Sequence, residues 1–425
     1  MSVAAAEASR GTGVAGTQAL DWLVETLWGM PAGVHVSPTR LRGRSRAKDS
    51  FAVLPSAAHP RLLVPLGSRR AASHALREYA TGKTSTRLAK SLLTMGIRSG
   101  LVQPLLRDRV HVSVADDVAP AELRHLLLKE HLREIFGRRD LEIAVTFDAP
   151  RPHRKPTLQI LSRDGSALGF AKVGWNDLTR PLVVNEARAL EWLGRRGLPL
   201  REFDVPELIH AGRWRDLEIL VVAPVSFGPR RRFLAGVPVA ATDEVGGLSP
   251  IERTALGASA CWRRSRERIR ATRTAQDGPA ARLEDVAGEI ERRYGDAVLE
   301  FGSWHGDWVP WNMGRLDGRL YVWDWERSGE PAPRGLDAVH FDYQAELGLR
   351  GTAPVAALEA TLRRSELVLP EVNLPARQAP LLLALHLLEM ALRFDEARAA
   401  GVDTADPKYL GALEALLSRD QRAAA

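Results

Sequence analysis

The stretch that decides the fold reads GSWHGDWVPWNMGRLDGRLYVWDWE and occupies residues 302–326. It contains three side chains that can bind a metal or accept a proton, namely Asp307, Asn312 and Asp324. Pro310 excludes a regular helix interior between Asp307 and Asn312, so both side chains are predicted to project from a loop. Because reactive groups usually lie on loops held by a rigid scaffold, this stretch is the first candidate for a reactive site.

A β-hairpin is predicted to bring Asp324 back to Asn312. Residues 317–318, Asp-Gly, are a strong signal for a two-residue turn, and an apolar run follows them at 320–323. In a hairpin of this register Asn312 lies opposite Trp323. Asp324 therefore arrives within one residue of Asn312.

The three side chains together suit a magnesium ion and a polyphosphate. A carboxylate and an amide oxygen form a hard-oxygen site for a magnesium ion that keeps several waters. Asp307, five residues before Asn312, is placed to orient a substrate hydroxyl and accept its proton. An acidic surface loop is the alternative, and it is the common role of any single aspartate. The joint pattern favours the reactive site.

This pattern resembles the catalytic loop and metal aspartate of the aminoglycoside phosphotransferase and choline kinase family. The residues that carry the resemblance are His305-Gly306-Asp307, Asn312 five positions later, and Asp324 at the end of an apolar strand. That family shares the protein-kinase-like fold. The resemblance implies that Asp307 is the catalytic base, that Asn312 and Asp324 bind Mg²⁺, and that His305 buttresses the loop.

The composition is that of a globular protein of more than one domain. The chain has 425 residues, of which 45% are hydrophobic and 26% charged, and this length suggests two or three domains. Its single cysteine, Cys261, excludes an internal disulfide and fits a reducing compartment.

The charge and the apolar runs indicate neither a nucleic-acid partner nor a membrane. The net charge is +7, but arginine is spread over the whole chain, so solvated faces explain the charge better than a nucleic-acid site. The start of the chain does not read as a signal peptide. The longest apolar run, 379–392, is too short to cross a bilayer. We therefore predict a cytoplasmic protein.

The N-terminal third, residues 1–138, carries no catalytic set of side chains. Hydrophobic periodicity and turn signals predict an α+β extension here. The predicted elements are helices at 18–30, 68–79, 85–95 and 120–136 and strands at 51–54, 61–66 and 110–114.

A buried ion pair is predicted in the next segment, where strands are expected at 141–147, 157–161 and 167–173. The period of two places Lys172 on the apolar side of the last strand, and a lysine there needs an anionic partner. Glu186 lies on the inward face of a helix predicted at 182–193. A Lys172–Glu186 pair follows, although a surface salt bridge without a role is the alternative.

The family resemblance extends to this pair. It implies that Lys172 contacts the α- and β-phosphates of ATP and that Glu186 holds the lysine. It also implies that adenine binds to the backbone around Val222 to Val225, where an apolar strand at 218–223 ends. The connection at 149–156 lacks the glycines of a protein-kinase phosphate loop. Its basic residues, Arg151, Arg154 and Lys155, are expected either to contact ATP as point charges or to be solvated.

The rest of the chain is predicted to be mainly helical. Residues 226–250 look like a loop or lid, and helices are expected at 251–272, 280–294, 354–367, 380–399 and 408–417. Asp337 resembles the family's aspartate at the start of the next helix and is predicted to cap that helix and steady the catalytic loop. Glu326 is either a further metal ligand or a plain exposed acid.

We therefore expect an α+β, bilobal protein-kinase-like fold with an additional α+β N-terminal domain. The boundaries are 1–138 for that domain, 139–225 for an antiparallel-sheet N-lobe, and 226–425 for a mainly helical C-lobe. The expected activity is transfer of the γ-phosphoryl group of ATP, with Mg²⁺, to a hydroxyl of a small molecule. A nucleotide-binding regulatory pseudokinase or scaffold is the alternative.

The acceptor is open among a sugar, an amino sugar, an aminoglycoside and a similar alcohol. Five tryptophans crowd the catalytic stretch and suit sugar rings or cations, but buried packing is their commoner role. Four acidic residues of the C-terminal helices could receive an amine-bearing acceptor or could be solvated, and these are Glu346, Glu389, Asp395 and Glu396.

Overall fold

Two compact units make up the chain. A computed structural model describes residues 13–29, 31–39, 45–79, 84–102, 106–147, 154–195, 200–225, 233–272, 279–400 and 408–424. The first unit comprises 3–194 and 206–230, and the second comprises 195–205 and 231–425. Each has its own sheet and hydrophobic core, and each is described by itself.

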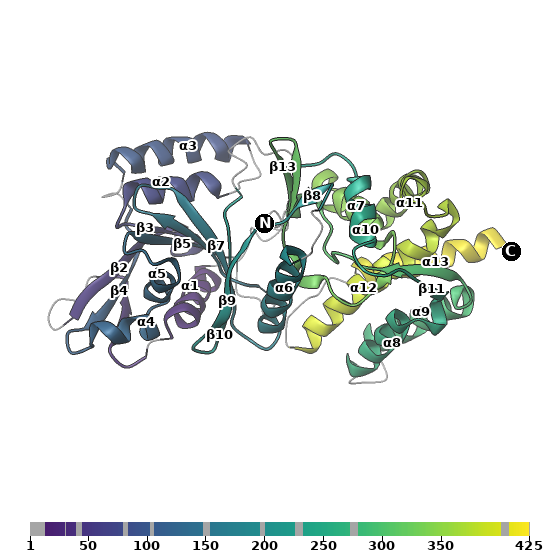
Figure 1. Ribbon diagram of the computed structural model, residues 1–425, viewed down its shortest axis with the longest axis horizontal. Coiled ribbons are helices and arrows are strands. Elements are labelled where there is room, and N and C mark those ends of the chain that lie inside the picture. Colours follow the sequence, from purple (N-terminus) through teal and green to yellow (C-terminus); the bar gives the residue numbers. More distant parts are fainter. Residues whose placement is uncertain are drawn as a thin grey trace. The chain divides into compact units, whose positions relative to one another are not determined.

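The described strands of the first unit form one nine-stranded antiparallel sheet in the order β1-β4-β2-β3-β5-β6-β7-β10-β9 (Figure 1). Its strands are β1 (Val34–Ser37), β2 (Ser45–Ser56), β3 (His59–Pro65), β4 (Arg109–Ala115), β5 (Leu141–Thr146), β6 (Thr157–Ser162), β7 (Ala167–Gly174), β9 (Leu208–Trp214) and β10 (Leu217–Val222).

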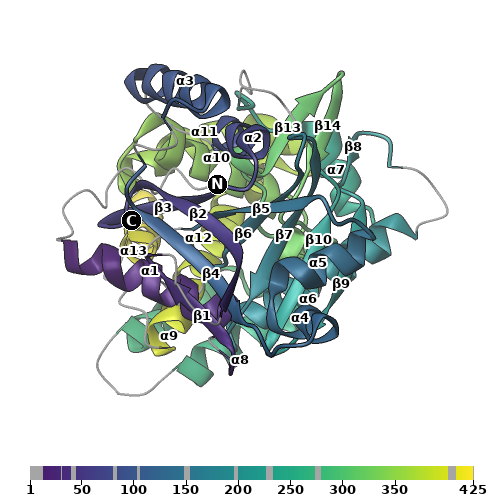
Figure 2. The same cartoon turned by 90° about the vertical axis from the view of Figure 1, so that its left-hand side faces the viewer.

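Helices cover both faces of this sheet (Figure 2). On one face lie α1 (Gly13–Trp28), η3 (Pro120–Glu122), α4 (Leu123–Leu126) and α5 (Leu128–Phe136), and on the other lie α2 (Arg69–Glu78) and α3 (Thr84–Ser99). The strands alternate accordingly. Phe51 and Val53 of β2 pack with α1 and α5, whereas Ala52 and Leu54 pack with α2. Both faces are apolar because both are buried.

The sheet continues across the predicted boundary at residue 139, because β3 pairs with β5. The boundary falls at Gly137, which ends α5 in the left-handed conformation and is therefore a helix terminus rather than a linker. Lys129 of α5 also forms buried ion pairs with Asp49 of β2 and Glu142 of β5. The described part of 1–138 has the expected α+β character and belongs to the same compact unit as the predicted N-lobe.

The second unit is mainly helical and is organised around α12. Its helices are α7 (Val239–Gly246), η4 (Leu256–Ala258), α8 (Ala260–Thr272), α9 (Pro279–Tyr294), η5 (Pro310–Asn312), η6 (Trp325–Arg327), α10 (Leu336–Ala345), η7 (Glu346–Arg350), α11 (Pro354–Glu371), η8 (Ala376–Gln378), α12 (Ala379–Ala399) and α13 (Lys408–Ala424). Helix α12 packs against α8, α9, α10, α11 and α13, which explains why its first half is apolar on all sides. Among the described residues, no helix is long and apolar enough to cross a membrane.

Two small sheets complete the second unit. In one, β12 (Val298–Gly302) lies between β11 (Glu252–Ala255) and β15 (Ala332–Pro333). In the other, β13 (Met313–Leu316) and β14 (Arg319–Val322) form a hairpin, and β8 (Phe203–Asp204) adds to β14 in parallel.

Several predicted elements were wrong in part. The helix expected at 251–272 begins only at Ala260, because residues 252–255 pair with β12 and the Ser259 hydroxyl accepts a hydrogen bond from the Trp262 backbone at the helix start. The helix expected at 120–136 breaks at Leu127, whose extended backbone lets its side chain enter the core. Helix α7 lies within the region expected to be a loop, and β9 was not predicted.

Candidate functional site

The predicted hairpin forms with the predicted register. Leu316 of β13 lies opposite Arg319 of β14, and Asp317 and Gly318 both have positive φ, as a two-residue hairpin turn requires. The backbone N–H of Trp323 donates to the carbonyl of Asn312 at 3.0 Å. The turn chemistry therefore carries the chain from Asn312 back to Asp324.

Asp307 and Asn312 contact each other directly. The Asn312 amide nitrogen donates to Oδ2 of Asp307 at 2.8 Å and to the Asp307 carbonyl at 3.1 Å. This arrangement uses the amide donors and leaves the amide oxygen of Asn312 as the atom that can face a cation. The Asp307 side chain keeps about a third of its surface exposed, at 32%, so its carboxylate is accessible.

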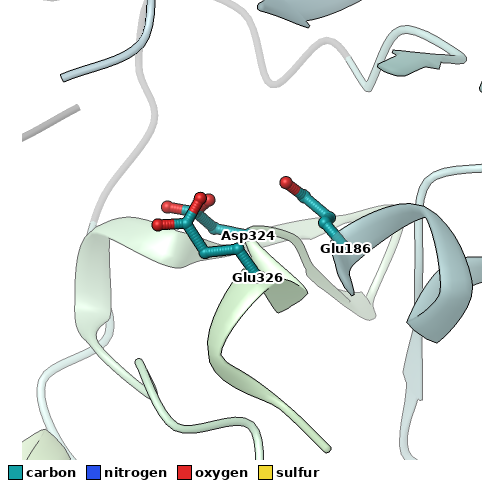
Figure 3. Close-up of side chains that lie close together, drawn as sticks. All are labelled: Glu186, Asp324 and Glu326. Carbon is teal, nitrogen blue, oxygen red and sulfur yellow. The ribbon is translucent and has the colours of Figure 1, made fainter. Parts of the chain in front are cut away.

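Asp324 follows β14 in the left-handed conformation, with φ 72° and ψ 48°. This backbone is unusual for a residue other than glycine and is commonest at functional sites. Its side chain lies beside that of Glu326, and both are partly exposed (Figure 3). The donor set of carboxylate and amide oxygens fits Mg²⁺. Asn312 and Asp324 are accordingly the candidate metal ligands, and Glu326 is a candidate for a further contact.

His305 ties the loop to the end of the hairpin. Its Nδ1 accepts from the Asp307 backbone N–H at 3.1 Å, so the ring proton lies on Nε2, which is 3.1 Å from the Trp323 carbonyl. The ring is fully buried between Trp308 and Trp325. Burial lowers the pKa of His305 and so keeps the imidazole neutral. In the neutral ring Nδ1 accepts a hydrogen bond and Nε2 donates one.

Asp337 holds the same loop from helix α10. Its carboxylate accepts the backbone N–H groups of His305 at 2.7 Å and Gly306 at 3.1 Å. The prediction that it caps the helix was wrong, because the cap position is Gly335 and Asp337 lies inside the first turn. Burial raises the pKa of Asp337, and these two hydrogen bonds oppose that rise. Asp337 therefore anchors the loop.

Gly306 is required by the loop's close packing. Its φ is +78°, and a Cβ added there would lie 2.5 Å from the Arg327 carbonyl oxygen. A side chain at this position would push the residue before Asp307 away from η6. The glycine of His-Gly-Asp is therefore structural.

Two further residues contact the loop and were not singled out from the sequence. Nε2 of His340 is buried, makes no hydrogen bond among the described residues, and lies 3.4 Å from Oδ1 of Asp307. The Arg393 guanidinium donates to the Gly306 carbonyl at 2.9 Å. The spacing of three from Asp337 could have revealed His340, because it places both side chains on one helix face. No local signal points to Arg393.

The surroundings set the ionisation of Asp307. Loss of hydration raises its pKa, but the interaction with His340 lowers it, and the charge of Arg393 lowers it further. The net effect holds the pKa of Asp307 below the ordinary value. The carboxylate is therefore ionised at neutral pH and able to accept a proton.

In the first unit, the predicted Lys172–Glu186 pair is confirmed. Nζ of Lys172, on β7, lies 2.7 and 2.6 Å from the two carboxylate oxygens of Glu186. Glu186 projects from α6 (Thr179–Gly194), as Figure 3 shows. Helix α6 packs on β7 and β10. The Glu186 side chain is 3% exposed and the Lys172 side chain 18%. The carboxylate is therefore buried, whereas a ligand can still reach the ammonium group.

The proposed adenine-binding segment starts where β10 ends. Val222 is the last residue of β10 and pairs with Phe170, and Val225 is partly exposed. A Cβ at Gly169 would lie 2.9 Å from the Val222 carbonyl oxygen, so glycine allows β7 to approach this strand end.

The glycine-free connection is described only at its end. Most of 149–156, including Arg151, lies outside the described residues, whereas Arg154 and Lys155 are partly exposed. Their expected role toward ATP stays a prediction.

The tryptophans divide into two groups. Trp308 and Trp325 are buried and pack on His305 and Phe203, so they belong to the core. The other three, Trp304, Trp311 and Trp323, are partly exposed. Packing therefore accounts for two of the five tryptophans in the stretch.

Comparison with known proteins gives matches at the level of solved structures. No protein-family model and no curated protein sequence matches the chain. Choline kinase LicA from Streptococcus pneumoniae is 16% identical, with a TM-score of 0.44 over 68% of this chain and 98% of its own. Aminoglycoside phosphotransferase APH(4)-Ia is 14% identical, with a TM-score of 0.46 over 68% and 97%.

A third match is a choline/ethanolamine kinase family protein from Mesorhizobium loti, 13% identical with a TM-score of 0.37 over 63% of this chain and 84% of its own. These structures fall in the kinase family that the sequence motifs resemble. The residues of the site, rather than these matches, support the proposals that follow.

Proposed function

We propose that this protein is a kinase that transfers the γ-phosphoryl group of ATP to a hydroxyl group of a small molecule. The observation that carries the proposal is the arrangement of Asp307, Asn312 and Asp324 around one loop and hairpin. A loop with only a structural role has no need of an accessible carboxylate, an amide whose oxygen can face a cation and a second carboxylate on a left-handed backbone.

Asp307 is the proposed catalytic base. It would align the acceptor hydroxyl and take its proton as the oxygen attacks the γ-phosphorus. Asn312 holds one carboxylate oxygen and His340 lies beside the other, so the carboxylate is positioned from two sides. Such positioning supplies much of the catalysis in phosphoryl transfer.

Asn312 and Asp324 are the proposed ligands of Mg²⁺, which when bound neutralises charge on the phosphates. Lys172, held by Glu186, is proposed to contact the α- and β-phosphates as a point charge. Backbone groups around Val222 and Val225 are proposed to bind adenine. In this assignment Glu186 touches no substrate and acts by orienting Lys172.

The proposal is tested by measuring ATP-dependent phosphorylation of a panel of sugars, amino sugars, aminoglycosides and choline-like alcohols. The reaction is run with Mg²⁺ and, as the control, with Mg²⁺ removed by a chelator. We expect transfer to at least one acceptor, lost on chelation and restored by added Mg²⁺. Tight binding of Mg²⁺ and ATP without transfer to any acceptor would instead support the regulatory pseudokinase.

Replacing His340 by glutamine tests how Asp307 is positioned. The change removes the neighbour that lowers the pKa of Asp307, so that pKa rises. The base form is then lost at a higher pH, and the acid limb of the kcat/KM profile moves toward higher pH. We also expect kcat to fall about 10- to 100-fold because the carboxylate is less well aligned. An unshifted acid limb would show that His340 is only structural.

A further inference from the structure

Two of the four helix acids that were predicted as possible receptors of an amine are already neutralised by arginines. Glu389 of α12 lies 2.6 Å from Arg268 and 2.7 Å from Arg393, which hold its pKa down to about 2 despite burial. Glu396 binds the same Arg268 at 2.6 Å. These carboxylates therefore already bind guanidinium groups and are not available to bind the ammonium group of an acceptor.

The other two acidic residues that could have received an amine are committed in the same way. Asp395 pairs with Arg398 at 2.7 Å. Glu346 pairs with Arg364 at 2.5 Å and also accepts from Thr352 at 2.6 Å. Each of the four acids predicted as possible amine receptors thus has an arginine partner.

These helices border the loop that holds Asp307. Arg393, the partner of Glu389, donates to the carbonyl of Gly306, the residue before Asp307. On the other side, a Cβ at Gly348 in η7 would lie 2.8 Å from the Trp311 ring. Glu389 and Glu346 therefore lie on elements that border the loop.

Arg327, in contrast to these paired side chains, has no ion-pair partner among the described residues. Among the described residues its guanidinium makes no hydrogen bond and no ion pair, and it is only partly exposed. It ends η6, three residues after Asp324, and its carbonyl and Cβ pack against Gly306. Burial lowers the pKa of Arg327, and the positive charge of Arg393 lowers it further. Three nearby carboxylates raise it, those of Glu326, Asp307 and Glu389. An arginine without a protein partner thus sits beside the loop of the proposed base.

We propose that the acceptor carries an oxyanion, either a carboxylate or a phosphate, and that Arg327 binds it. The inference rests on the proposed kinase function and narrows its substrate class. A guanidinium matches the two oxygens of either anion with parallel hydrogen bonds. A polycationic acceptor would meet the positive charges of Arg327 and Arg393, and the four helix acids that were predicted as its possible receptors are already paired with arginines.

The first test compares hexose acceptors that differ in one substituent and therefore in charge. Glucuronate, a hexose phosphate, glucose and glucosamine supply a carboxylate, a phosphate, a neutral group and an ammonium group. We expect the highest kcat/KM with one of the two anions, and the pair itself distinguishes the carboxylate from the phosphate. A preference for glucosamine would overturn the inference while leaving the kinase function in place.

The second arm uses Arg327→Gln, with Arg377→Gln as the matched control. Like Arg327, Arg377 forms no ion pair among the described residues and lies in a short helix of the same unit. Unlike Arg327, its side chain is exposed. Arg327→Gln is expected to lower kcat/KM for the anionic acceptor about 10- to 100-fold, with the KM for ATP unchanged and Arg327→Lys recovering part of the loss. Equal kcat/KM in Arg327→Gln and Arg377→Gln would contradict the assignment.

The third arm does not depend on turnover. Binding of inorganic phosphate is measured by calorimetry, without nucleotide or metal, in the wild type and both glutamine variants. The wild type and Arg377→Gln are expected to bind it, and Arg327→Gln to bind it at least about 10-fold more weakly. Equal binding by all three proteins overturns the oxyanion site whether or not transfer is seen. Loss of transfer to every acceptor with this binding difference intact overturns the kinase function instead.

Discussion

Replacing Asp307 by asparagine is expected to lower kcat for phosphoryl transfer by about 100- to 10,000-fold, the usual contribution of a positioned general base. The substitution keeps the size of the side chain and an oxygen that can accept from Asn312, but it removes the site that takes the proton. The measurement is single-turnover transfer from ATP to the acceptor found in the panel.

Two controls separate lost chemistry from lost structure in this variant. The midpoint of thermal unfolding and the KM for ATP should both stay near their wild-type values, since Asp307 is partly exposed and is not assigned to the nucleotide. Transfer at the wild-type rate in Asp307→Asn would mean that another group accepts the proton or that the loop is not catalytic.

Replacing Lys129 by methionine is expected to reduce the free energy of unfolding by about 3–5 kcal/mol, the typical effect of breaking a buried ion pair. Nζ of Lys129 lies 2.5 Å from Asp49 and 2.7 Å from Glu142, and all three side chains are at most 7% exposed. Removing the ammonium leaves two buried carboxylates facing each other. Urea unfolding monitored by circular dichroism gives the change.

The matched control is Arg138→Met, which breaks the exposed pair between Arg138 and Asp140. That pair has a similar distance, 2.8 Å, but its side chains are 45% and 44% exposed. We expect a much smaller change in the free energy of unfolding than for Lys129→Met, because exposed ion pairs are screened by solvent and contribute little. An equally small effect of Lys129→Met would show that these buried charges do not hold the described part of 1–138 to the rest of the sheet.

Local sequence signals were enough to predict the hairpin and the ion pair of the candidate site. The Asp-Gly turn fixed the register of the hairpin, because both residues must adopt positive φ, and so brought Asp324 to Asn312. The Lys172–Glu186 pair followed from strand and helix periodicity, because an inward lysine needs a nearby anion. In both cases the partners are close in sequence.

The contacts that could not be predicted come from distant segments. His340 and Arg393 contact the loop from α10 and α12. Local sequence patterns do not predict which helices pack against which segment. Asp337 was placed correctly as an anchor of the loop but wrongly as a cap, because a first-turn carboxylate can face another segment as well as its own backbone.

The division of the chain shows the same limit of local reasoning. A boundary was predicted near residue 139 because the pattern changes there to consecutive strands, and in the structure β3 and β5, which lie on either side of that position, pair in one sheet. Strand β11 was read as part of a helix because the partner that makes it a strand, β12, lies more than one helix further along the chain. Both pairings join segments that are remote in sequence, so no local pattern indicates them.

The most direct test of the central claim is to identify the product. The protein is incubated with Mg²⁺, the acceptor panel and ATP labelled at the γ-phosphate, and the acceptors are separated and examined by mass spectrometry. The account predicts one acceptor bearing a single labelled phosphoryl group on a hydroxyl oxygen, and formation of that product about 100- to 10,000-fold more slowly with Asp307→Asn under the same conditions. Label found only in free phosphate, in equal amounts for both proteins, would contradict it.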